Sequence, residues 1–166
     1  MVEDMVEERA LMGYEAEGYR IRSDGTIWNP YIERWTFGFA TWCTGKYYAK
    51  IRLWKKHRCR FMFVHRLVAD HFVVNPRILF FDVVDHINND SLDNRVENLR
   101  WLNDQLNSRN QKGKPNWIKK WKKWSVQVNG TTRGYFKDRA EAQRVRDEIS
   151  EREFNELYRA LTTGHY

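Results

Sequence analysis

The sequence is poor in cysteine and has no long apolar run, and each absence excludes a class of protein. Its 166 residues contain two cysteines, Cys43 and Cys59. They are too few for a disulfide framework and do not form the CxxC pairs of a zinc knuckle. No apolar segment approaches the length of a transmembrane helix, and the acidic first residues do not resemble a signal peptide. We therefore expect a cytoplasmic protein without a membrane partner.

Acidic residues are missing from two long stretches, which are strongly basic as a result. None occurs between Glu33 and Asp70, or between Gln105 and Lys137. The whole chain has 29 Lys and Arg against 22 Asp and Glu, a formal net charge of +7, and 15% aromatic residues. Basic residues interleaved with aromatic rings are typical of proteins that bind nucleic acid. A soluble domain with a basic shell is the alternative.

Alternating residues predict two β-hairpins in the first part of the chain. One spans residues 20–29 around Asp24-Gly25, a dipeptide that strongly favours a hairpin turn. The other spans residues 46–63, with its turn near Lys55-Lys56-His57. A two-stranded ribbon of this charge fits a DNA groove, whereas a solvated sheet face is the alternative. Its basic residues are Lys46, Lys50, Arg52, Lys55, Lys56, Arg58 and Arg60.

Helical spacing occurs before and after these hairpins. Residues 65–72, "HRLVADHF", predict a short helix whose buried side carries Leu67, Val68 and Phe72. His65 and His71 are interpreted as structural residues of this helix. A helix face that ends at Gly13 is predicted from the spacing of Val2, Met5, Val6 and Met12.

Residues 84–110, "VDHINNDSLDNRVENLRWLNDQLNSRN", contain seven asparagines around one Asp-His pair. The pattern predicts a strand ("VVDHI"), a polar loop, a second strand ("NLRWL") and a helix ("DQLNSRNQ"). Short amides and acids favour turns, and we interpret five of them as residues that shape the loop and do nothing else. These are Asn88, Asn89, Asp90, Asp93 and Asn94.

The Asp-His pair suits phosphodiester hydrolysis. The attacking water must lose a proton, which a histidine near its normal pKa can accept. The charge on the leaving oxygen must be neutralised, which a divalent cation can do. Asp85 and His86 are adjacent, and neighbouring residues of a strand point to opposite faces. They therefore face one site only where the strand ends or bends.

The segments "HRLVADHF", "VDHINNDSLDNRVENLRW" and "QLNSRNQ", in this order, resemble the HNH endonucleases, in particular the small phage and intron-type homing and nicking enzymes. The resemblance covers about residues 65–111 and implies a ββα-metal (His-Me finger) core, which is a two-stranded hairpin followed by a helix. By the resemblance, Asp85 is the metal-binding acid, His86 the general base, and Asn98 the asparagine that pins the hairpin loop. Asn107 stands where the family usually has a histidine ligand.

The resemblance leaves the second metal ligand open, since Asn103 and Asn110 are alternatives to Asn107. It implies one Mg²⁺ (or Mn²⁺) ion per active site. Asparagine offers a neutral carbonyl oxygen, and Mg²⁺ takes few protein ligands and keeps several waters.

The C-terminal part resembles an AP2-type DNA-binding domain. Lys112 to Asn116 mark a linker. Strand-like segments with a turn at Asn129-Gly130 follow, and then a long helix from about Asp138, where Asp138 and Glu141 form a capping box. The resemblance implies a three-stranded sheet packed on this helix. We expect DNA contacts from Arg109, Lys112, Lys114, Lys119, Lys120, Lys122, Lys123 and Arg133.

We therefore predict an α+β protein with three modules: a β-rich DNA-contacting module (1–64), the HNH core (65–112) and the AP2-like domain (113–166). The predicted function is that of a phage homing endonuclease, acting in the infected host cell on double-stranded DNA as a monomer or homodimer. The alternative is a non-catalytic DNA-binding regulator that uses the AP2-like tail.

Overall fold

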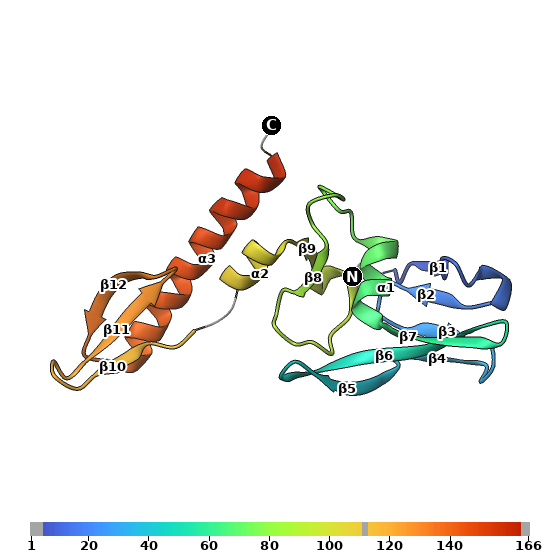
Figure 1. Cartoon of the computed structure of the whole chain (residues 1–166), viewed down its shortest axis with the longest axis horizontal. Helices are drawn as coiled ribbons and strands as arrows, with labels where there is room; N and C mark the ends of the chain where they lie inside the picture. Colours follow the sequence, from blue (N-terminus) through green and yellow to red (C-terminus); the bar gives the residue numbers. More distant parts are fainter. Residues whose placement is uncertain (1–4, 111–112, 164–166) are drawn as a thin grey trace. The chain divides into compact units, whose positions relative to one another are not determined.

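The computed structural model describes residues 5–110 and 113–163. It contains two compact units, Met1–Leu102 and Asn103–Tyr166 (Figure 1). The division falls after the second strand of the predicted HNH core, and the three-module division stays a prediction. The mixture of helices and several sheets agrees with the predicted α+β class. No helix within the described ranges is long and apolar enough to cross a membrane.

The first unit contains three antiparallel sheets, a helix and two short 3-10 turns. The four-stranded sheet, in the order β1-β2-β3-β4, consists of β1 (Glu8–Ala10), β2 (Arg20–Arg22), β3 (Ile27–Asn29) and β4 (Arg34–Thr36). The three-stranded sheet consists of β5 (Phe39–Cys43), β6 (Lys46–Lys55) and β7 (Arg58–Phe63). The remaining elements are η1 (Glu15–Glu17), α1 (Val64–Phe72), β8 (Val83–His86), η2 (Val96–Asn98) and β9 (Leu99–Leu102).

Both predicted hairpins are confirmed. β2 pairs with β3 across the Asp24-Gly25 turn, and Gly25 has a φ of 87°, a left-handed conformation that glycine adopts without strain. β7 pairs over its whole length with residues 50–55 of β6, and the turn between them contains Lys56 and His57. The helix predicted at residues 65–72 is α1, with Leu67 and Val68 buried and Phe72 half-buried.

The helix predicted for the first dozen residues is wrong. Residues Glu8–Ala10 form β1, which pairs with β2. The Glu8 carboxylate forms ion pairs with Arg20 (2.7 Å) and Arg22 (3.0 Å) of that strand. Met5, Val6 and Met12 are exposed, so the proposed apolar face packs against nothing, and Val2 lies outside the described residues.

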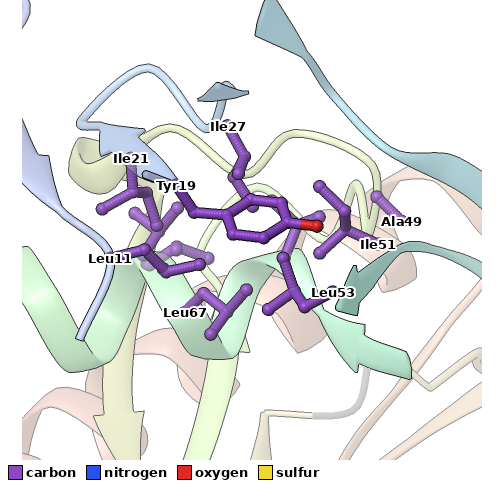
Figure 2. Packing of buried hydrophobic residues seen from close by; sticks show 11 residues of the cluster. Leu11, Tyr19, Ile21, Ile27, Ala49, Ile51, Leu53 and Leu67 are labelled. Carbon is purple, nitrogen blue, oxygen red and sulfur yellow. The ribbon is translucent and has the colours of Figure 1, made fainter. Parts of the chain in front are cut away.

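Tyr19 lies at the centre of the first unit's core (Figure 2). Its side chain is fully buried, and its ring lies among Ile21, Ile27, Leu53 and Leu67. Its hydroxyl oxygen accepts a hydrogen bond from the backbone N–H of Trp54 (3.1 Å). The cluster joins the four-stranded sheet, β6 and α1, so it includes residues from both the predicted N-terminal module and the predicted HNH core.

The second unit contains a three-stranded antiparallel sheet and two helices. Its elements are α2 (Asp104–Arg109), β10 (Asn116–Ile118), β11 (Lys123–Val128), β12 (Thr131–Phe136) and α3 (Arg139–Thr163). Val126 and Val128 of β11 pack against Ala142 of α3 in a small apolar cluster. Asp138 caps α3, because its Oδ1 accepts the Glu141 N–H (2.7 Å).

Candidate active site

Asp85 and His86 lie at the end of β8, which is where two adjacent strand residues must lie if both are to face one site. In the antiparallel β8–β9 pair, Asp85 lies opposite Arg100 and His86 lies opposite Leu99. His86 is the last residue of β8. The pair therefore stands at the transition from strand to loop, where the alternation of side chains can be broken.

The His86 ring is buried and held in one orientation. The side chain is 6% exposed, and its Nε2 lies 3.1 Å from the Asn94 Oδ1. The Asn94 Nδ2 donates to the Leu92 carbonyl (3.1 Å), so its Oδ1 faces the imidazole. An amide oxygen only accepts, and we therefore place the proton of neutral His86 on Nε2. Nδ1 is then the nitrogen with a lone pair.

The interpretation of Asn94 as a loop-shaping residue alone is incomplete. Asn94 is buried, with 4% exposure, and is the hydrogen-bond partner of His86. The turn at Gly25 lies against it, since a Cβ on Gly25 would come within 3.0 Å of the Asn94 carbonyl oxygen. Nothing in the sequence separates Asn94 from the neighbouring amides, because its role depends on a contact across the fold.

Burial keeps His86 neutral. Loss of solvation lowers the pKa of His86 below its ordinary value, although the hydrogen bond that His86 donates to Asn94 and the charge of Asp85 raise it in part. The Lys46 charge lowers it further. At neutral pH the ring is therefore in the form that can accept a proton.

The rings of His65 and Tyr48 contact His86, and Phe63 packs behind His65. The His65 ring centroid lies 5.1 Å from that of His86, in an edge contact, and the Tyr48 centroid lies 6.3 Å from it. Phe63 packs on His65 at 5.3 Å. His65 is 7% exposed, and burial together with the charge of His86 lowers the pKa of His65 to about 3. The ring next to the candidate base is thus uncharged at neutral pH.

His71 has a different environment from His65. Its Nδ1 lies 2.6 Å from the Leu67 carbonyl oxygen, and its Nε2 accepts the Met12 N–H (2.9 Å). His71 therefore joins α1 to the segment before the first hairpin, whereas His65 contacts the His86 ring of the candidate site.

Asp85 is paired with an arginine that sequence reasoning missed. The Arg100 Nε and Nη2 lie 2.9 and 2.8 Å from the Asp85 Oδ2. Both side chains are largely buried, at 19% exposure for Arg100 and 12% for Asp85. Opposite charges at directly paired positions of two strands are a recognisable signal, but the register of the strands had to be known first.

Asn98 joins the two ends of the β8–β9 loop. Its side-chain oxygen accepts the Asn88 N–H (2.9 Å), and its Nδ2 donates to the Asp93 carbonyl (2.8 Å). Its backbone carbonyl accepts the Ile87 N–H (2.9 Å). Asn98 is 6% exposed, and loss of such buried bonds leaves polar groups unsatisfied.

The remaining loop residues form turns, as predicted. The Asn88 side-chain oxygen accepts the Asp90 N–H (2.7 Å), and the Asp90 Oδ1 accepts the Leu92 N–H (3.0 Å). Asn89 has a φ of 64°. These local bonds stabilise a loop that has no regular strand pairing of its own.

The candidate second ligand lies in the other unit. Asn107 is on α2, and its convergence with Asp85 and His86 stays a prediction. Asn103 is the N-cap of α2, and its Oδ1 accepts the Leu106 N–H (2.9 Å). Asn110 is the C-cap residue. The capping bond of Asn103 engages the oxygen that a metal would need, so Asn107 is a better candidate ligand than Asn103.

Within residues 5–110 and 113–163, no group of three or more His, Cys, Asp or Glu side chains is placed to hold a metal ion. The predicted ligand set, one carboxylate and one amide, is of another kind. Such oxygen donors suit a hard cation that keeps most of its waters. A carboxylate has about four lone-pair sites, so Asp85 can bind Arg100 and a cation together.

The basic residues of the 46–60 hairpin lie on two faces of the sheet. By alternation, Lys46, Lys50 and Arg52 share a face with Tyr48, here called the open face. The strand pairing adds Phe39, Phe61 and Phe63 to it. Lys50 lies over the Phe63 ring at 4.5 Å. The opposite face buries Ile51 and Leu53 and carries the other predicted contacts, Lys55, Arg58 and Arg60, while Lys56 lies in the turn.

The basic residues of the second unit concentrate in the connection between β10 and β11. Lys119, Lys120 and Lys122 lie there and are exposed, and Lys123 begins β11. Lys114 is exposed and Arg109 half-buried. Arg133 forms an ion pair with Glu153 of α3. Lys112 lies outside the described residues.

Comparisons with known proteins support an HNH endonuclease. No protein-family model matches the chain. A segment of 39 residues is 56% identical to an uncharacterized HNH endonuclease (L247) of Acanthamoeba polyphaga mimivirus, and covers 24% of this chain and 10% of that protein. A solved structure of DNA binding and cleavage by the HNH homing endonuclease I-HmuI matches with a TM-score of 0.53 and 28% identity. That match covers 63% of this chain and 57% of the other.

His65 gives the stability of the fold a pH dependence of defined sign. Its pKa is lowered from 6.5 to about 3, so the unfolded chain takes up the proton more readily. The neutral ring therefore stabilises the fold fully above the unfolded pKa, and this contribution is lost as the pH falls toward the folded pKa. As the pH falls, we predict that the His65→Phe variant loses less unfolding free energy than the wild type. The difference is up to about 1.4 kcal/mol per pH unit between the two pKa values.

Urea denaturation of both proteins across this pH range measures the difference. His57→Phe, at an exposed turn position, is the control and should behave like the wild type. Parallel acid losses in the wild type and His65→Phe would contradict a buried neutral His65.

Proposed function

We propose that this chain is a metal-dependent HNH endonuclease of the homing type, which hydrolyses a phosphodiester bond in double-stranded DNA. The observation that carries the proposal is the state of His86. Its ring is buried, neutral and fixed by Asn94 at the end of β8, and its Nδ1 carries the lone pair. The likeness to a homing endonuclease with 28% identity supports the same activity.

In the reaction proposed, His86 acts as the general base. Its Nδ1 takes a proton from the water that attacks phosphorus, while its Nε2–H stays bonded to the Asn94 oxygen. That oxygen carries partial negative charge and stabilises the imidazolium that forms. Because His65 is neutral beside it, His65 adds no positive charge that would oppose the protonation of His86.

Asp85 and Asn107 would hold the divalent cation. When bound, Mg²⁺ or Mn²⁺ would neutralise charge on the scissile phosphate and on the departing 3′ oxygen. Arg100 holds the Asp85 carboxylate in place through two nitrogen atoms. One chain carries one such centre, so we expect a monomer to nick one strand, and cleavage of both strands to require a dimer or a second binding event.

We assign DNA contacts to both units. In the first unit, the open face continues from the site, because Tyr48 of that face touches the rings of His65 and His86. In the second unit, the lysines between β10 and β11 supply exposed charge. The three-stranded sheet packed on α3 supports an AP2-like role for this unit.

The first test is nicking of supercoiled plasmid DNA in Mg²⁺. We expect His86→Ala to lower the nicking rate at least about a hundredfold, because the general base is lost. His57→Ala, which removes an exposed histidine, should nick like the wild type. If His86→Ala retains wild-type nicking, the assignment fails. If the wild-type protein binds DNA in EDTA and cuts none in Mg²⁺, the protein is a non-catalytic DNA-binding regulator.

The second test separates the two faces of the β5–β7 sheet. We expect Lys50→Ala/Arg52→Ala to reduce the slope of log K against log salt concentration by about two, because two phosphate contacts are lost. Lys55→Ala/Arg58→Ala removes the same charge from the other face and should change the slope less. Fluorescence anisotropy with duplex DNA in EDTA measures both slopes, and equal reductions would show that net charge, and not the open face, sets the affinity.

A further inference from the structure

A groove beside the open face has no role in the reaction proposed above. It has a volume of about 470 Å³, which lies in the range of sites for small organic ligands. The connection between β3 and β4 forms one wall, and the open face of β5–β7 forms the other. Its principal side chains are Asn29, Tyr31, Phe39, Arg52, Trp54 and Phe61.

The aromatic side chains of this groove are exposed to an unusual degree. Tyr31 is 61%, Phe61 58% and Phe39 47% exposed. The rings of Phe39 and Phe61 meet edge to face, with centroids 6.0 Å apart. Exposed aromatic rings gathered around one concavity mark a binding surface, and their rigid flat faces suit a planar ligand.

Gly38 allows the chain to lie close against β6 beside the groove. It lines the groove and has a φ of 80°. A Cβ at this position would come within 2.3 Å of the Lys50 carbonyl oxygen. It would also come within 3.4 Å of the Val64 Cγ2, so it would point toward the β6 backbone and the core, and this close approach of the chain to β6 requires glycine.

The surroundings of the groove select an anionic ligand with flat rings. No acidic residue is among the described residues that line it, and Arg52 contributes a guanidinium beside the Trp54 ring, 5.5 Å from its centroid. Lys50 is the next residue of the open face along β6, and Tyr48 follows it and touches His86. Tyr48 and Arg52 are four positions apart along the strand, or about 13 Å, so one DNA strand can reach both places.

We propose that this groove binds an unpaired nucleobase of the DNA strand, a few nucleotides from the bond that is cut. The inference rests on the proposed function, which supplies the DNA. A paired base presents only its edge to a protein, whereas the aromatic rings of this groove can stack only on a base whose own faces are accessible. Phe39 and Phe61 stack on the base, and Arg52 lies near the phosphate that follows it.

The test compares two strands that differ only in their bases. The full chain in EDTA is titrated with an oligothymidylate strand and with an abasic strand of the same length, and fluorescence anisotropy gives both affinities. We expect the wild type to bind the oligothymidylate about tenfold more tightly, which is the scale of one stacked base. Phe61→Ala should abolish this preference, and Phe61→Trp should retain it.

Phe37→Ala is the matched control. Phe37 is 64% exposed in the same region and is not among the residues that line the groove, so its loss should leave the preference intact. Equal wild-type affinity for the two strands would overturn the groove assignment alone. The assignment would also fail if Phe61→Ala weakened binding of paired duplex and of oligothymidylate equally. It would fail as well if Phe61→Ala changed the oligomeric state without changing the affinity for DNA. Absence of binding to any DNA, duplex included, would overturn the proposed function as well.

Discussion

The hydrogen bond between Asn94 and His86 is the constraint on which the candidate site depends. Without a hydrogen-bond partner, either ring nitrogen of a neutral imidazole could carry the proton. The Asn94 amide, itself fixed by the Leu92 carbonyl, assigns the proton to Nε2. The Gly25 turn lies against Asn94, and the Val96 N–H donates to the Ser23 carbonyl (2.8 Å). The first hairpin therefore supports the loop that orients the proposed base.

This dependence explains why the N-terminal strands and the HNH-like segment share one unit. Tyr19, α1 and β6 form a common core, and α1 carries His65 into contact with His86. The open face of β5–β7 reaches the same histidines through Tyr48. The scaffold that fixes the His86 ring thus also presents basic and aromatic residues along one continuous surface next to it.

Local patterns in the sequence predicted the hairpins, α1, the β8–β9 pair and the cap of α3, because each of these depends on residues that are close along the chain. The N-terminal helix was wrong because the pairing of Glu8 with Arg20 and Arg22 depends on a strand ten or more residues away. Asn94, Arg100 and His65 were missed as neighbours of the site for the same reason. Their roles come from register and packing, and an asparagine in a polar loop has the same local signature whether it faces water or a histidine.

We propose that Asp85 binds a divalent cation next to His86, and Asn107 is the predicted second ligand. The most direct measurement is paramagnetic broadening of the histidine ring resonances by Mn²⁺ in a protein with isotope-labelled histidine. We expect selective broadening of His86 over His57 and His71, and loss of this broadening in both Asp85→Ala and Asn107→Ala. Broadening that spares His86, or that persists unchanged in Asn107→Ala, would contradict it.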